Sequence, residues 1–368
     1  MSRPRILINA VSVTAGGGRA YIRNLLRAIA DDDRGYDFSV LCAADQLSEQ
    51  EACGLPRITL DLLGKSAVRS VLRLLYEETG LPFRARRFDL LYCIADVAPA
   101  WSPVPTVVAL RNLNIYDRRF FNNTRFKTLE RLVRIGLRRA RRVVVPTRAA
   151  ADLIRQRITI PEERVRVVPH GIARGVFEAV AQATAPDARY LFLPSAVEDH
   201  KNVLALVEAV PLLEDPDLEV WIAGTTDVCP EYVRSVQRRI EELSLGARVR
   251  LLGPVPYEHI LHYHRGAVAM VFPSLLESFG HPLLEAMLAE TPVIASDIAS
   301  LREVAGDVAC YFDPNDPAAL AAAVDGALRD AAGTRARVEL GRARAAEFSW
   351  KRSTDLLCDV FGEALSSH

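Results

Sequence analysis

Short apolar runs alternate with amphipathic stretches along the first half of the chain. The runs are long enough for buried strands, and a stretch such as Arg19 to Ala30 carries its apolar residues at helical spacing. The runs predict strands at 5–13, 37–42, 58–60, 90–93 and 106–110. Strands that alternate with helices in this way are typical of a parallel, doubly wound sheet.

The same alternation begins again in the second half. It predicts strands at 190–193, 219–223, 249–252, 268–272 and 293–296. Between the halves, residues 175–188 are rich in Ala, Pro and polar residues without a clear period, which is typical of a linker. We therefore expect an α/β protein with two Rossmann-like, doubly wound domains that face a central cleft, and a length of 368 residues agrees with two domains.

Composition excludes some classes of function. The formal net charge is zero, so nucleic acid is not expected as a partner. The six cysteines are scattered and form no C-x-x-C pair, which favours a reducing compartment. The first strand follows the start of the sequence without a signal peptide, and no apolar run reaches transmembrane length, so we expect a cytoplasmic protein.

Three glycines, Gly16, Gly17 and Gly18, stand between the first strand and the first helix. A strand, a glycine loop and a helix form the layout of a turn that holds phosphate with its backbone N–H groups. A tight turn that needs positive φ is the alternative, but it explains one glycine more easily than three.

The stretch 273–297 carries two carboxylates eight residues apart. Glu277 lies in a loop after a buried strand, and Glu285 falls in the first turn of a helix expected from about Pro282 to Glu290. Both can face the crevice at the carboxyl end of a parallel sheet, where open α/β sheets bind ligands. For each glutamate, a simple interaction with the helix dipole is the alternative, and it explains Glu285 better than Glu277.

Positive groups are expected beside these carboxylates. The backbone N–H groups of Gly280, His281 and Leu283 lie where a helix start can hold an anion. Lys201 follows the first strand of the second half and can bring an ammonium group to the same crevice, although an exposed loop lysine is the commoner outcome. The pattern predicts a site for a ligand that carries hydroxyls and phosphate.

Residues 118–142 form a strongly basic segment in a neutral protein. Its apolar residues recur at helical spacing, which predicts a cationic amphipathic helix. Peripheral contact with an anionic membrane and a merely solvated face are both open. The basic residues are Arg118, Arg119, Arg125, Lys127, Arg131, Arg134, Arg138, Arg139, Arg141 and Arg142.

Candidate metal ligands are few. Residues 31–33 contain a D-x-D pattern, but they stand in a polar turn at a helix end. His259 and His262 share a helix face, whereas His264 points elsewhere and no cysteine is near. A zinc site is therefore not expected.

The order of these motifs resembles the large retaining glycosyltransferase family four, which has the GT-B fold. E-S-F-G-H-P-L-L-E-A-M, followed by T-P-V-I-A-S-D, is similar to the E-x7-E region of that family. The resemblance covers nearly the whole chain and includes residues 16–18, 143–153, 167–172, 200–202, 251–255, 313–320 and 348–350.

The resemblance implies a nucleotide-diphosphate sugar donor, bound mainly by the C-terminal domain, and an acceptor bound mainly by the N-terminal one. It implies transfer with retention of configuration, without a metal or other cofactor. We place the domains at 1–182 and 183–349, with a C-terminal helix at 350–368 that crosses back to the first domain.

The resemblance also implies roles for single residues. Lys201 would bind the diphosphate, Glu285 the ribose, and Glu277 would lie by the donor sugar. Further donor contacts would come from backbone at Gly280, His281, Pro282 and Leu283, from the glycine loop at Gly17 and Gly18, and from the base-binding loop at Val255.

Two positions depart from the family's pattern. Ser195 stands where many members have an arginine, six residues before the lysine, and so weakens charge neutralisation. Arg111 stands where many members have a histidine near the donor sugar. We hypothesise that Arg111 supplies positive charge to the leaving diphosphate and joins Glu277 and Lys201 as a catalytic residue. Pairing of Arg111 with a nearby acid is the alternative.

The expected function is therefore transfer of a sugar from a nucleotide sugar to an acceptor. An envelope polysaccharide or lipid-linked glycan is favoured as the acceptor by the basic segment, and a small molecule stays open. A nucleotide-sugar epimerase on the same fold is one alternative, and a catalytically silent binding module is another. If the basic segment binds lipid, the protein would lie at the inner face of the cell membrane.

Overall fold

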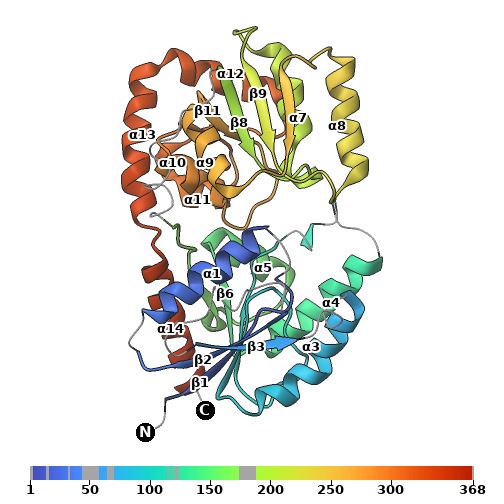
Figure 1. Ribbon diagram of the computed structural model, residues 1–368, viewed down its shortest axis with the longest axis vertical. Coiled ribbons are helices and arrows are strands. Elements are labelled where there is room, and N and C mark those ends of the chain that lie inside the picture. Colours follow the sequence, from blue (N-terminus) through green and yellow to red (C-terminus); the bar gives the residue numbers. More distant parts are fainter. Residues whose placement is uncertain are drawn as a thin grey trace. The chain divides into compact units, whose positions relative to one another are not determined.

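The chain folds into two compact units (Figure 1). One contains Met1–Gly171 together with Ser349–His368, and the other contains Ile172–Phe348. The computed structural model describes residues 3–13, 16–31, 34–43, 58–63, 70–113, 116–117, 119–120, 124–173 and 188–366. Most of the expected linker at 175–188 and part of the D-x-D pattern at 31–33 lie outside these residues.

The first unit is built on a parallel sheet with the strand order β3-β2-β1-β4-β5-β6-β7 in the described part of the chain. The expected strands are confirmed, although the first ends at Asn9 and not at Val13. The bounds are β1 Arg5–Asn9, β2 Asp37–Ala43, β3 Ile58–Leu63, β4 Leu90–Cys93, β5 Thr106–Ala109, β6 Arg142–Val145 and β7 Val165–Val167.

Helices α1 Gly16–Ala30, α3 Ser70–Ala85, α4 Thr124–Arg139 and α5 Arg148–Arg157 belong to the same unit. The expected glycine loop is wrong in one respect, because residues 16–18 form the first turn of α1. Local capping follows the sequence at α5, where the hydroxyl of Thr147 accepts a hydrogen bond from the N–H of Ala150 at 3.1 Å.

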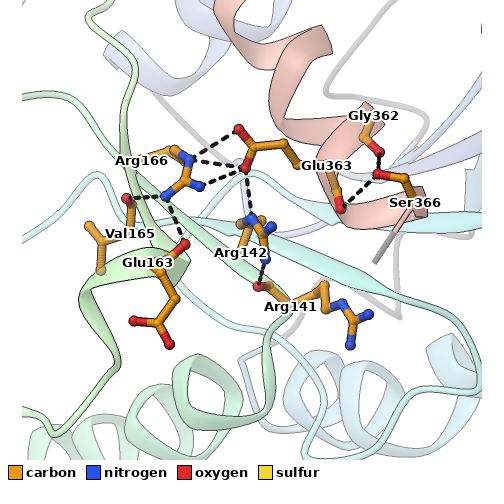
Figure 2. Close-up of polar contacts among 8 residues, drawn as sticks. All are labelled: Arg141, Arg142, Glu163, Val165, Arg166, Gly362, Glu363 and Ser366. Atoms are coloured by element: carbon orange, nitrogen blue, oxygen red, sulfur yellow. Dashed lines mark hydrogen bonds and ion pairs between the residues drawn. The ribbon is translucent and has the colours of Figure 1, made fainter. Parts of the chain in front are cut away.

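The C-terminal helix α14, Trp350–Ser366, packs beside α1 in the first unit (Figure 1). Its residues Leu357 and Phe361 are buried in the core of that unit. The carboxylate of Glu363 accepts hydrogen bonds from Arg142 on β6 at 2.9 Å and from Arg166 on β7 at 3.0 Å (Figure 2). Apolar burial and this charged bridge both hold α14 on the unit.

The basic segment is not one helix. Helix α4 covers Thr124–Arg139. Arg142 belongs to strand β6, and its guanidinium forms an ion pair with Glu363. Val133 and Leu137 are buried, whereas Lys127, Arg131 and the pair Arg138 and Arg139 are exposed. Among the described residues, no helix is both long and apolar enough to span a membrane.

The second unit has a parallel sheet with the strand order β10-β9-β8-β11-β12-β13 in its described residues. Both faces are apolar, which explains the continuous hydrophobic runs in the sequence: Leu191 and Leu193 of β8 join one cluster, and Tyr190 and Phe192 join another. The bounds are β8 Tyr190–Pro194, β9 Glu219–Ala223, β10 Val249–Gly253, β11 Ala269–Phe272, β12 Val293–Ser296 and β13 Cys310–Phe312.

Helices cover this sheet (Figure 1). Asp316 caps α12, as its side chain accepts hydrogen bonds from the N–H groups of Ala318 and Ala319. The bounds are α7 Val203–Ala209, α8 Pro230–Glu242, α9 Tyr257–Gly266, α10 His281–Leu288, α11 Ala299–Ala305, α12 Pro317–Arg329 and α13 Ala331–Ala346.

We predict that Glu363→Gln destabilises the first unit by about 1 kcal/mol at pH 7, because two arginines lose a charged acceptor. The effect is no larger because the carboxylate is 37% exposed and solvent screens its charge. Burial raises the pKa of Glu363, but hydrogen bonds from Arg142 and Arg166 outweigh it and lower the pKa overall. A lowered carboxyl pKa gives stability that is present above the unfolded pKa and is lost in acid.

Urea midpoints of the variant and the parent protein should therefore differ at pH 7 and converge below about pH 4. Glu347→Gln, which removes a carboxylate that is 52% exposed in a surface pair, serves as the control. A difference for Glu363→Gln that is equally large in acid would contradict the proposed charge interaction.

Candidate functional site

The candidate site lies at the carboxyl edge of the second sheet, where the strand order reverses between β8 and β11. Lys201 follows β8 and Glu277 follows β11, and these two strands are neighbours. The Nζ atom of Lys201 lies 2.6 Å from Oε1 of Glu277, and the side chains are only 19% and 12% exposed. Two residues that are 76 positions apart in the sequence thus form one largely buried ion pair.

The two loops that carry this pair are tied together by backbone contacts. The N–H of Leu275 donates to the carbonyl of His200 at 2.8 Å. Asn202 adopts a left-handed conformation with φ +57°, and its amide donates to the carbonyls of Pro273 at 3.1 Å and Pro314 at 2.7 Å. Lys201 is therefore held by its neighbours in the sequence and is not a mobile surface lysine.

Acidic groups surround the Lys201 ammonium. Burial raises the pKa of Glu198, and the nearby Lys201 only partly offsets this effect. Burial lowers the pKa of His200 to about 4, so this histidine is neutral near pH 7. The ammonium of Lys201 is thus the positive group in this part of the site, facing Glu277.

The start of α10 differs in detail from the sequence expectation. Gly280 has φ +90°, and a Cβ atom there would lie 2.8 Å from Leu301, so the position requires glycine. The helix begins at His281, and Pro282 occupies its first turn as expected. The N–H of Leu283 donates to the carbonyl of Gly280 at 3.1 Å.

Glu285 lies in the second turn of α10, so its expected place in the first turn is wrong and the helix dipole does not account for it. Tyr257 donates a hydrogen bond to Oε1 of Glu285 at 2.9 Å. Burial raises the pKa of Glu285 to about 7, although the hydrogen bond from Tyr257 opposes the shift. This carboxyl group is therefore only partly ionised at neutral pH.

The fully buried His264 faces the same carboxyl group. Its Nε2 atom lies 3.9 Å from Oε2 of Glu285, and burial lowers its pKa to about 3, so the imidazole is neutral. Sequence reasoning considered His264 only as a metal ligand and missed Tyr257. The order of the elements could have indicated both residues, because α9 follows the loop after β10 and packs against α10.

Ser195 and Val255 also follow strands of this sheet. Ser195 comes directly after β8 and is 7% exposed, and its hydroxyl donates to the carbonyl of Ala196 at 3.2 Å. Val255 follows β10 and is partly buried against the cluster that contains Trp221. Both lie at the carboxyl edge, but Val255 follows the outer strand of the sheet.

Arg111 lies at the carboxyl edge of the first sheet, two residues after β5. Its guanidinium carbon stacks 3.8 Å from the ring centroid of Tyr21, and its backbone N–H donates to Asp96 at 2.6 Å. Burial raises the pKa of Asp96, while hydrogen bonds and the charge of Arg111 oppose the shift. Arg111 is thus held between an aromatic ring and a buried acid.

Two further residues join Arg111 at this edge. The ring of His170, 6% exposed after β7, lies 5.0 Å from that of Tyr21, and Trp350 lies 5.2 Å from it. Gly17 and Gly18 are in the first turn of α1, and a Cβ atom at Gly18 would lie 3.0 Å from Val13. Sequence reasoning did not identify Tyr21 as the partner of Arg111.

Two family profiles match the chain. Residues 15–174 match Glycosyltransferase Family 4, and residues 178–344 match Glycosyl transferases group 1. The chain belongs to the group 1 glycosyl transferases of family 4, with the GT-B fold. The family profiles follow one another along the chain and cover almost all of it.

Curated relatives agree with this family. O-antigen chain mannosyltransferase B of Escherichia coli is 40% identical over 172 residues, which cover 45% of this chain and 43% of the relative. O-antigen chain mannosyltransferase RfbU of Salmonella typhimurium is 26% identical over 57% of this chain and 59% of the relative. The chain thus spans about half the length of the curated relatives that it matches.

A solved structure confirms the fold. Anabaena HepE in complex with UDP and glucose has a TM-score of 0.78 to this chain, at 18% identity, over 98% of this chain and 99% of that one. The likeness extends through both units.

We predict that Glu285→Gln raises the thermal midpoint of the ligand-free protein at pH 8 by a few degrees. A carboxyl group with a raised pKa stabilises the fold while it is protonated and loses this contribution as the pH rises from about 4.5 to about 7. Glutamine copies the protonated form and can still accept from Tyr257.

The parent protein and the variant should unfold at similar temperatures near pH 4.5. Glu290→Gln, at an exposed position just beyond α10, is the matched control. A variant that is less stable than the parent at pH 8 would show that the ionised carboxylate is well solvated by its neighbours.

Proposed function

We propose that this protein transfers a sugar from a nucleotide-diphosphate sugar to an acceptor, with retention of configuration and without a metal. The observation that carries the proposal is the convergence of Lys201, Glu277 and the start of α10 at the reversal point of the second sheet. Family membership supports transfer, and the mannosyltransferase relatives favour it over epimerisation. HepE, which is described in complex with UDP and glucose, supports a nucleotide sugar as the donor.

In the proposed donor complex, Lys201 binds the diphosphate in exchange for part of its contact with Glu277. Glu277 is then free to accept hydrogen bonds from the donor sugar. Glu285 accepts hydrogen bonds from the ribose hydroxyls, which replace the hydrogen bond from Tyr257. The backbone from Gly280 to Leu283 contributes N–H groups near the phosphate and the sugar.

The proposed reaction is front-face attack. The bond between the anomeric carbon and the leaving phosphate oxygen breaks, the acceptor oxygen bonds to the same face, and the leaving phosphate takes the acceptor proton. Lys201 stabilises the charge that develops on the diphosphate. We propose that Arg111 assists it, and stacking on Tyr21 would fix the orientation of that guanidinium.

An envelope polysaccharide or lipid-linked glycan is the proposed acceptor. The O-antigen chain mannosyltransferase relatives support this choice. Helix α4 presents the exposed cations Lys127, Arg131 and Arg138, with the 43% exposed Ile135 among them. A cationic face with an apolar residue suits peripheral contact with anionic lipid, at the cytoplasmic side of the membrane.

Incubation of the pure protein with UDP-, GDP- and ADP-sugars tests the reaction class. Slow release of the nucleoside diphosphate supports transfer to water in place of the acceptor. A changed sugar still bound to the nucleotide would establish epimerisation, and binding without turnover would establish a silent binding module. Turnover that persists with a strong chelator is expected for a metal-independent reaction.

With the preferred donor, we expect Lys201→Met to lower kcat/KM about 100-fold, because the diphosphate loses its ammonium. Lys351→Met, at a lysine that is 83% exposed on α14, makes the same change of side chain away from the site and should have little effect. We expect Arg111→Ala to reduce turnover about tenfold or more. Normal donor turnover by Arg111→Ala would rule out its proposed role.

Liposome flotation tests the membrane contact. We expect the protein to float with vesicles that contain anionic lipid, and to be released as salt is raised, since the attraction is electrostatic. The double variant Lys127→Gln/Arg131→Gln should float less. Flotation that does not depend on salt or on anionic lipid would contradict this proposal.

A further inference from the structure

A cavity of about 440 Å³ lies in the first unit, at the opposite edge of the sheet from Arg111. Pro105 and Arg141 directly precede β5 and β6, so the cavity is at the amino edge of the sheet, whereas Arg111 follows the carboxyl end of β5. The lining residues are Pro99, Ala100, Trp101, Ser102, Val104, Pro105, Thr106, Gly136, Arg139, Ala140 and Arg141.

Two guanidinium groups line the cavity, and the described lining contains no acid. Arg142 is bound by Glu363, but the side chain of the adjacent Arg141 points away from that pair (Figure 2). The Nε atom of Arg141 is buried and has no hydrogen-bond partner among the described residues. A buried charged donor without a partner is costly, so its environment favours an anion.

The two hydroxyl groups of the wall are already engaged. The hydroxyl of Ser102 donates to the carbonyl of Val104 at 2.8 Å, and that of Thr106 donates to the same carbonyl at 3.3 Å. Glu78, which is not among the lining residues, accepts from the N–H of Ala100 at 2.9 Å. Both hydroxyls thus have hydrogen-bond partners within the wall. The two arginines are the charged groups of the described lining that can bind a ligand.

One exposed aromatic side chain lines the cavity, and a second lies near the first through a shared arginine. Trp101 and Phe83 are 51% and 62% exposed. The guanidinium of Arg86 lies 4.8 Å from the ring centroid of Phe83 and 5.8 Å from that of Trp101. This cation between two rings extends the positive surface of the cavity and orders its apolar edge.

Close backbone packing gives the cavity a preformed wall. A Cβ atom at Gly136 on α4 would lie 2.6 Å from the carbonyl oxygen of Ala98, so the helix and the 98–106 segment approach more closely than any other residue would allow. The positions of Arg139, at the end of α4, and of Trp101, on that segment, are therefore set by the fold.

We propose that this cavity binds the phosphate ester of a ligand whose apolar or sugar part lies on Trp101 and Phe83. Arginine suits this task, because its planar fork of N–H donors binds phosphate oxygens in pairs. The phosphate ester can belong to a lipid headgroup or to a soluble sugar phosphate, which present the same chemistry to Arg139 and Arg141. The inference does not depend on the proposed transfer reaction.

Two arms of one experiment distinguish these sources. Glycerol phosphate is titrated while tryptophan fluorescence is recorded, since Trp101 lines the cavity. Vesicles of phosphatidylglycerol are compared with vesicles of phosphatidylcholine in the second arm. The test variant is Arg139→Gln/Arg141→Gln, and the control is Lys351→Gln/Arg352→Gln, which removes two exposed charges from α14 outside the cavity.

We expect the cavity variant to bind glycerol phosphate about tenfold more weakly, with the control within about twofold of the parent. A cavity-dependent signal with both probes identifies a phosphate ester site, and one with vesicles alone identifies a lipid headgroup. Equal losses in both variants, or no loss in the cavity variant, would overturn the proposal. Binding of a nucleoside diphosphate by all variants confirms their folding and separates this outcome from failure of the donor proposal.

Discussion

The candidate donor site depends on one buried ammonium group. Lys201 is removed from most of its water, and such a charge persists only with a close partner, which Glu277 provides at 2.6 Å. The pair joins the loops after β8 and β11, the two strands that flank the reversal of the sheet. In the proposed reaction the diphosphate takes over from Glu277, so the same charge that stabilises the free protein would bind the donor.

Arginines illustrate how neighbours assign different tasks to one residue type. Arg142 and Arg166 hold α14 through Glu363, and Arg111 is stacked on Tyr21. Arg141 adjoins Arg142 in the sequence but lines a cavity with Arg139. The basic segment therefore combines a structural bridge, an exposed helix face and a cavity wall, although the sequence presents it as one continuous run of charge.

Much of the fold could be predicted from the sequence, because buried parallel strands require apolar runs and the helices between them require one apolar face. Glu277 and Lys201 were identified because each follows a strand of one sheet, and carboxyl ends of parallel strands meet at one edge. The roles of Tyr257, His264 and Tyr21 were missed, since they arise from contacts between different elements of the fold. Glu285 was identified, but its burial and raised pKa were not.

The sequence by itself determined the two doubly wound sheets, the family and the residues expected to meet the donor, because strand spacing and local motifs carry that information. Tertiary structure alone decided which partner each charge received. The pairing of Lys201 with Glu277, the neutral environment of Glu285 and the separate fates of Arg141 and Arg142 follow from distances and burial. The order of residues in the sequence gives neither these distances nor this burial. Both matter, since electrostatic energy depends on separation in space and on removal from water.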